Sequence, residues 1–140
     1  MSVAALRHLG PALALAAAAC TAPGIPGEGL AVPFAPSADA ERGRAVFVSR
    51  DAGHCVLCHA APGIEVAGNV GPSLAGVGSR LDAAQIRLRV ADITRINPGA
   101  VMPAFHRVDD LRGVAPEYRG RPVLSGQQVE DVVAWLASLK

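Results

Sequence analysis

The stretch Cys55-Val56-Leu57-Cys58-His59 decides how this sequence is interpreted. Two cysteines three positions apart, followed at once by a histidine, form the CxxCH pattern that attaches c-type haem. The two thiols can reach the two vinyl groups on one edge of a porphyrin, and the next histidine is then placed under the iron. The motif therefore predicts one covalently bound haem c with His59 as an axial iron ligand.

Three other uses of these cysteines fit the sequence less well. A redox-active CxxC of the thioredoxin kind sits at a strand-to-helix junction, and no strand pattern precedes Cys55. A structural zinc site needs four ligands, and His54 and His59 adjoin the two cysteines too closely for both to chelate easily. A disulfide between Cys55 and Cys58 would leave His59 and the surrounding loops unexplained.

The iron of such a haem takes a second axial ligand, and the candidates are few. Apart from the initiator, the chain has one methionine, Met102, in the segment Val101-Met102-Pro103-Ala104-Phe105. A neutral thioether favours ferrous iron, raises the reduction potential and suits outer-sphere electron transfer. His106 is the rival ligand and would give a bis-histidine haem of lower potential. Two further alternatives are an open sixth position and Met102 as an ordinary core residue.

Composition limits the class of protein further. The chain has 140 residues, enough for one compact domain. Its 15 glycines and 11 prolines argue against a long-helix bundle and favour short elements joined by loops. The formal charge of +1 argues against a nucleic-acid partner. Lys140 is the sole lysine, so the chain lacks the lysine ring of a freely diffusing electron carrier.

The N-terminal residues predict export. A basic start, Arg7 with His8, precedes a run of Pro, Ala and Leu at positions 11–19, which is too short to cross a bilayer. The small residues before Cys20 allow lipoprotein processing, and ordinary signal cleavage nearby fits as well. We expect residues 1–22 to be an export signal, the mature protein to be periplasmic, and membrane attachment only if Cys20 is lipidated.

Residues 23–37 are rich in Pro and Gly and predict a flexible linker, or an arm lying on a partner, ahead of a folded domain at 38–140. In that domain we expect a helix at 38–50 and two helices that begin at capping boxes. The capping pairs are Asp82 with Gln85 and Ser125 with Gln128; on the first of these helices the apolar stripe is Ile86, Val90 and Ile93, with Arg87 and Arg89 facing away from it.

Two long stretches between these helices, residues 51–80 and 97–124, show no sustained helical or alternating period. Loops of that length are uncommon in a small domain unless something binds in them. The CxxCH motif lies in the first loop and Met102 lies in the second. We therefore expect both loops to enclose the haem.

Longer stretches resemble a known family. CVLCHAAPG, GNVGPSLAGVGSRL, INPGAVMPAFHRV and VAPEYRGRPVLSGQQVEDVVAWLASL, in that order, resemble SoxX, the monohaem cytochrome c subunits of SoxAX complexes of bacterial thiosulfate oxidation. The resemblance covers roughly residues 38–140. It implies an all-α, class I cytochrome c-like domain of short helices and long loops around the haem.

The resemblance also implies details of that domain. In Gly71-Pro72-Ser73-Leu74, the carbonyl of Pro72 is expected to accept the ring N–H of His59, and Leu74 to pack on the porphyrin. A plain turn is the alternative for this segment. The residues Gly43, Phe47 and Trp135 resemble those at the crossing of the N- and C-terminal helices.

The resemblance implies a function that this chain carries out together with other proteins. A SoxA-like cytochrome subunit would form a heterodimer with this chain and join thiosulfate to a cysteine of the SoxYZ carrier, while electrons leave through haem to a downstream acceptor cytochrome. This chain would be a non-catalytic electron-transfer subunit of an L-cysteine S-thiosulfotransferase. The segments 56–62 and 101–105 are apolar and uncharged apart from His59, which predicts a dry docking surface. The alternative is a free-standing or lipid-anchored monohaem carrier to a terminal oxidase.

Overall fold

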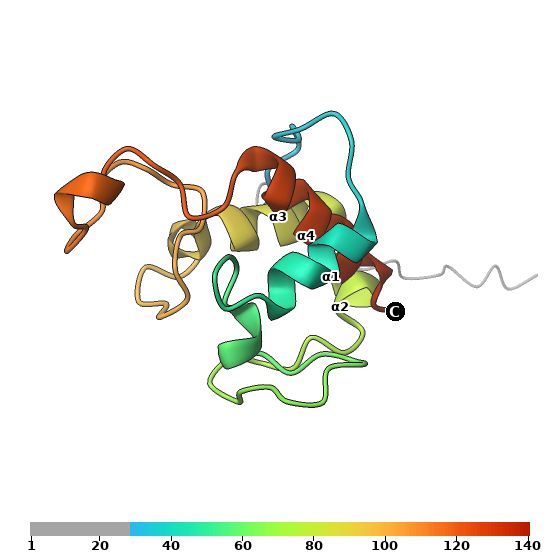
Figure 1. Ribbon diagram of the computed structural model, residues 1–140. Coiled ribbons are helices and arrows are strands. Elements are labelled where there is room, and N and C mark those ends of the chain that lie inside the picture. Colours follow the sequence, from blue (N-terminus) through green and yellow to red (C-terminus); the bar gives the residue numbers. More distant parts are fainter. Residues whose placement is uncertain (1–28) are drawn as a thin grey trace, which may run out of the picture.

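A computed structural model describes residues 29–140 (Figure 1). The predicted export signal, Cys20 and the first part of the predicted linker lie outside the described residues. Within residues 29–140 the regular elements are all helical, which confirms the all-α fold class, and none of these helices is long and apolar enough to cross a bilayer. The elements are α1 (Ala40–Val48), η1 (Cys55–Leu57), α2 (Val77–Arg80), α3 (Ala83–Asp92), η2 (Ile93–Arg95), η3 (Pro116–Tyr118) and α4 (Gly126–Ser138).

Two helices begin at the capping boxes expected for them. At the start of α3, Gln85 N–H donates to the Asp82 carboxylate at 2.8 Å, and Asp82 N–H donates to the Gln85 side chain at 3.0 Å. At the start of α4, Ser125 N–H donates to the Gln128 side chain at 2.9 Å, and Gln128 N–H donates back to the Ser125 hydroxyl. These reciprocal bonds satisfy backbone N–H groups that have no partner within the helix.

The crossing of α1 and α4 forms the centre of the fold (Figure 1). A Cβ atom at Gly43 would overlap the backbone carbonyl of Asp131, so a glycine is required for this close approach. One turn later, the rings of Phe47 and Trp135 lie with their centroids 4.7 Å apart, tilted by 52°. This confirms the expected crossing of the first and last helices.

The long helix α3 packs on α4, and the single turn α2 packs against the end of α4. Gly78 lies against the backbone of Ala137, and its N–H donates to the carbonyl of Leu139 at 2.9 Å. The residues of the apolar core come from all the α-helices and both loops: Phe47, Ala61, Val77, Ile86, Val90, Phe105, Leu124, Val129, Val132, Val133, Trp135 and Leu136.

Arg87, expected to face away from the apolar stripe of its helix, is nevertheless buried. Its side chain is 7% exposed and forms a two-pronged ion pair with Glu130 of α4, whose side chain is 5% exposed. Arg87 Nε donates to Glu130 Oε1 at 2.7 Å, and Nη2 donates to Oε2 at 2.9 Å. The forked guanidinium matches the carboxylate, so α3 and α4 are joined by a buried charge pair.

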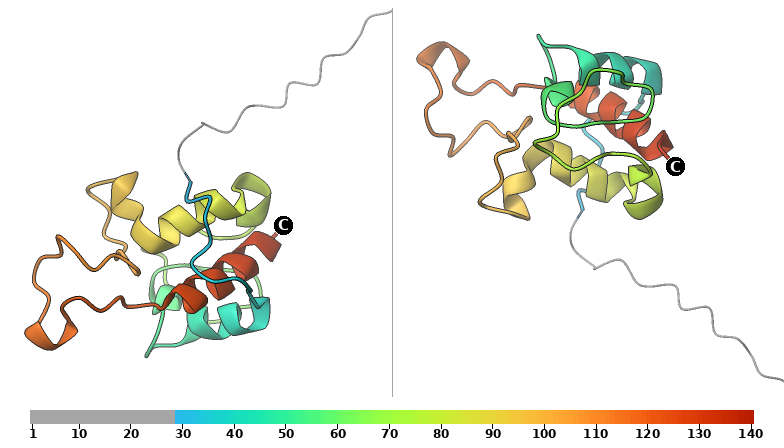
Figure 2. Two further views of the ribbon diagram at one scale, coloured as in Figure 1. Left: turned by 90° about the horizontal axis from the view of Figure 1, so that it is seen from above. Right: turned by 90° about the horizontal axis from the view of Figure 1, so that it is seen from below.

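Residues 29–37, which we call the N-terminal arm, cross α3 and α4 without forming a helix (Figure 2, left). Leu30 N–H donates to the carbonyl of Ala84 at 3.0 Å, and Phe34 N–H donates to Glu130 at 3.0 Å. The sequence predicts a flexible linker or an arm on a partner here. In the structure this part of it lies on the chain's own helices.

The two long loops lie on different sides of the helices. The first, coloured green, passes beneath α1 and α4, and the second extends away from the helices with η3 at its tip (Figure 1). The loop that carries CxxCH is therefore held close to the core, whereas much of the second loop projects from it.

Candidate haem site

The CxxCH motif is shaped by a single 3₁₀ turn, η1. His54 precedes it in the left-handed region with φ 55°, and the N–H groups of Cys58 and His59 both donate to the carbonyl of Cys55, at 3.1 and 2.9 Å. Side chains three positions apart are eclipsed in a 3₁₀ turn. The turn therefore holds the Cys55 and Cys58 thiols on one side, which suits two attachments to one porphyrin edge.

Both thiols are free, and Cys55 lacks the character of a redox cysteine. Burial raises the pKa of the Cys55 thiol to about 11, so the group is protonated at neutral pH. Reactive CxxC cysteines have a depressed pKa instead. Residues 29–140 also hold no cluster of three or more His, Cys, Asp or Glu side chains that could bind a metal ion, which is the arrangement a zinc site needs.

The imidazole of His59 is oriented by the loop that follows it. His59 Nδ1 lies 2.8 Å from the carbonyl oxygen of Pro72, the hydrogen bond that the family resemblance implies. With Nδ1 as the donor, Nε2 is the nitrogen left for a metal. A Cβ atom at Gly71 would overlap the His59 ring, so this position requires glycine. The arrangement is that of a metal ligand with a fixed ring.

A second glycine in this loop has a role that the sequence analysis missed. A Cβ atom at Gly68 would overlap the carbonyl of Leu57, and Gly68 N–H donates to the carbonyl of Val56 at 2.9 Å. The loop then returns so that Leu74 N–H donates to the carbonyl of Ala60 at 2.8 Å. The spacing of Gly68 three positions before Gly71 is the one sequence signal that could have indicated it.

The two candidates for the second ligand have different surroundings. Met102 is partly buried and packs against the same apolar core as Cys55 and Leu74. His106 has its Nδ1 2.8 Å from the carbonyl oxygen of Leu124, and its ring stacks on Phe34 with centroids 4.2 Å apart. The Nδ1 bond of His106 is of the same kind as that of His59 and also leaves Nε2 for a metal, so this bond does not distinguish the two candidates.

These residues fit a haem c. The donor set comprises two free thiols, an imidazole with a free Nε2 and a thioether, which are the groups that attach and ligate such a haem. Apolar side chains of the two loops are exposed beside them, including Leu57 (43%) and Val101 (85%).

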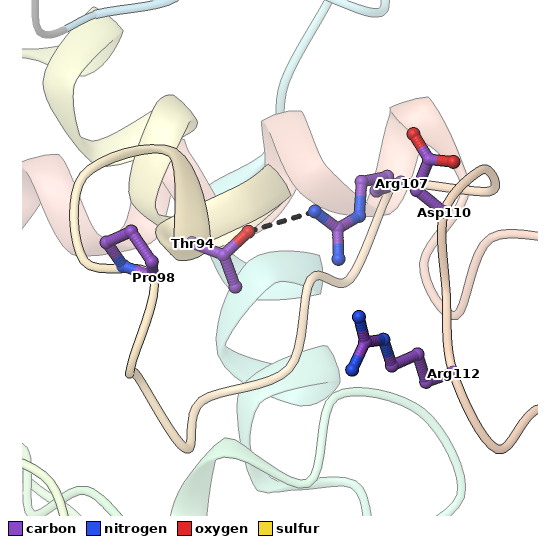
Figure 3. A pocket seen from close by; sticks show the side chains of 5 residues that line it. All are labelled: Thr94, Pro98, Arg107, Asp110 and Arg112. Carbon is purple, nitrogen blue, oxygen red and sulfur yellow. Dashed lines mark hydrogen bonds between the residues drawn. The ribbon is translucent and has the colours of Figure 1, made fainter.

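A separate surface hollow of about 550 Å³ lies after α3 and is lined by Thr94, Pro98, Arg107, Asp110 and Arg112 (Figure 3). Arg107 Nη1 donates to the Thr94 hydroxyl at 3.0 Å. None of the predicted site residues lines this hollow, and the charges around it are mixed. It is not part of the haem site as the sequence predicts it.

Comparisons with known proteins show what the whole domain is similar to. Residues 40–140 match the family model of cytochrome c. A chain of the crystal structure of SoxXA from P. pantotrophus is 34% identical, with a TM-score of 0.67, over 79% of this chain and 85% of that one. No curated protein gives a significant match.

The chain therefore belongs to the cytochrome c family, whose members carry covalently bound haem c and transfer electrons. Within that family, the likeness to the SoxXA structure confirms the resemblance to SoxX that the sequence motifs predict.

Proposed function

We propose that this chain is the electron-transfer subunit of a periplasmic SoxAX-like complex that joins thiosulfate to a cysteine of a SoxYZ carrier. One haem c would be attached to Cys55 and Cys58, with His59 and Met102 as axial ligands. The observation that carries the proposal is the similarity to a chain of a structure named SoxXA. The two chains are 34% identical, and the match covers 85% of the SoxXA chain. The His59–Pro72 hydrogen bond supports the ligand assignment.

The residues of the site favour electron transfer over catalysis. Haem bound here supplies a one-electron couple between ferric and ferrous iron. The Pro72 carbonyl orients His59 and would raise its basicity as a ligand, and Met102 would supply the thioether ligand. Cys55 and Cys58 are the only cysteines in residues 29–140, and the proposed haem attachment would use both. The described chain keeps no thiol for sulfur chemistry, so that step belongs to a partner.

An apolar surface beside the site supplies the place for that partner. Leu57 and Val101 belong to the two segments that flank the haem, and both are exposed. We propose that a SoxA-like cytochrome covers this surface, which excludes water and brings a second haem near the first. SoxYZ would then meet the complex, and a downstream cytochrome would accept the electrons.

The test is to tag the C-terminus, purify the protein from the periplasm and identify any protein present in equal amount. We expect a second c-type cytochrome, and reduction of haem in the purified complex by thiosulfate together with SoxYZ. Val101→Asp should weaken the association at least about tenfold, because it buries an unpaired charge in the interface.

The matched control is Val32→Asp, at a valine that is 80% exposed on the N-terminal arm. This variant should keep the partner. Recovery of the tagged protein alone, as a His/Met haem protein indifferent to thiosulfate, would contradict the proposal and leave a general electron carrier.

A further inference from the structure

The N-terminal arm reaches the segment that carries Met102, although the two lie far apart in the sequence. We infer that Phe34 and His106 are positioning residues that hold this segment so that Met102 stays at its ligand position. The inference rests on the proposed function, because it concerns the same thioether. It assigns a role to the arm and to His106 that neither the motifs nor the comparisons provide.

Hydrogen bonds fix the chain directly after Met102. His106 N–H donates to the carbonyl of Ala91 in α3 at 3.0 Å. Its ring Nδ1 lies 2.8 Å from the carbonyl oxygen of Leu124, whose own N–H donates to the carbonyl of Phe105 at 2.8 Å. Leu124 is fully buried just before α4. Residues 105 and 106 are thus tied to the end of α3 and the start of α4.

The N-terminal arm packs on these hydrogen-bonded residues. The ring of Phe34 packs on the ring of His106 with an interplanar angle of 47°. The Phe34 backbone is anchored by its N–H donating to the buried Glu130 carboxylate at 3.0 Å. A Cβ atom at Gly126 would come within 2.8 Å of the Phe34 Cβ, so this glycine leaves room for the arm. Phe34 is therefore held against His106 from both sides.

The expected effect follows from competition at the iron. A small ligand replaces the thioether only in conformers in which Met102 has moved away, so its apparent affinity rises with the population of those conformers. The contact between the tilted rings of Phe34 and His106 opposes that movement. Loss of an aromatic pair of this kind should raise the population of conformers in which Met102 has moved away by about twofold to tenfold.

The experiment uses the full-chain ferric holoprotein and titrates it with imidazole, followed by the haem absorbance. Phe34→Ala should bind imidazole about twofold to tenfold more tightly than the unmodified protein. His106→Ala should show a larger increase. His106→Phe should show a smaller increase than His106→Ala, because it keeps an aromatic ring beside Phe34 but loses the bond to Leu124. The reduction potential should fall in the same order.

Two controls separate positioning from general destabilisation. Val32→Ala changes an exposed residue of the same arm and should leave imidazole affinity unchanged. Leu139→Ala removes core packing at the far end of α4 and should lower stability to urea without changing the affinity. An equal increase in either control, or none in Phe34→Ala, would overturn the inference.

A reference variant distinguishes failure of the positioning role from failure of the proposed Met102 ligation. Met102→Ala should bind imidazole most tightly of all. If it does so while Phe34→Ala behaves like the unmodified protein, the positioning role is overturned and the ligation stands. If Met102→Ala binds imidazole no more tightly, Met102 is not the ligand, and both fail.

Discussion

At the scale of single residues, the two proposed ligands of the haem are held in different ways. His59 is fixed by a bond to the Pro72 carbonyl and by contact of its ring with Gly71. Met102 is held by packing against the core and by the hydrogen bonds that fix residues 105 and 106 after it. Loss of a ligand should therefore begin on the Met102 side.

Replacing Met102 by Ala should open the iron to outside ligands. The ferrous variant should bind carbon monoxide readily, and its reduction potential should fall, because the thioether that favours ferrous iron is gone. Visible absorbance with and without carbon monoxide measures this. An unchanged low-spin spectrum in Met102→Ala would eliminate Met102 as ligand.

Single residues also show what the sequence could predict about the site. The CxxCH motif follows from residue type and spacing, because few other uses need those groups in that order, whereas the Pro72 contact was implied by the family resemblance. The requirement for glycine at Gly68 arises only when the loop folds back on Leu57. His106 likewise has the chemistry of a ligand, and only the three-dimensional contacts with Phe34 and Leu124 show how it is engaged.

At the scale of elements, the buried pair between Arg87 of α3 and Glu130 of α4 sets how these helices join. Glu130→Ala should lower the free energy of unfolding by about 3–5 kcal/mol, because it leaves the Arg87 charge buried without its partner. It also removes the acceptor of Phe34 N–H. Urea unfolding followed by circular dichroism measures the change.

Glu117→Ala is the matched control, since Glu117 is exposed at the tip of the second loop. It should change the free energy of unfolding by less than about 0.5 kcal/mol. Equal losses in the two variants would mean that the buried pair has no special role.

The elements themselves were predictable where local chemistry decides them. Asp82 and Ser125 cap their helices through side chains three positions away, which the sequence displays directly. The turn α2 has only four residues, too short for a periodic pattern, and its position depends on Gly78 meeting α4. The burial of Arg87 was not predicted, because periodicity shows which face is apolar but not that an acidic partner lies opposite another face.

At the scale of the whole molecule, an ion pair joins the first and last helices of the domain. Arg42 of α1 donates to the Asp131 carboxylate from Nε at 2.9 Å and from Nη2 at 3.0 Å, and Asp39 N–H donates to it at 2.8 Å. The hydrogen bond from Arg42 holds the pKa of Asp131 below its ordinary value of 3.8. The carboxylate therefore stabilises the fold above that pH and loses its effect as the pH falls through the lowered pKa.

Asp131→Asn tests this contribution. The variant should unfold at lower urea concentration than the unmodified protein above about pH 4, and the gap should narrow as the pH falls further and the native carboxyl becomes neutral too. Urea midpoints measured across this range give the comparison. A gap of constant size would show that the charge of Asp131 does not contribute.

The course of the whole chain was only partly predictable. The likeness to SoxX indicated the crossing of the first and last helices, and α1 and α4 confirm it. The N-terminal arm was expected to be a flexible linker, because a Pro- and Gly-rich segment carries no pattern that shows what it contacts. Its acceptors, Ala84 and Glu130, become available only when α3 and α4 are packed.

The pairing of α1 with α4 also constrains the order in which the chain can fold. Asp39 and Asp131 are 92 positions apart, so their contact closes a loop of nearly the whole domain. With nine residues, α1 is shorter than the roughly 12–15 that an isolated helix needs in water. A growing chain that lacks α4 offers α1 no partner, and contacts of such high contact order form late. We therefore expect the CxxCH loop between them to stay accessible for covalent modification until α1 and α4 pair.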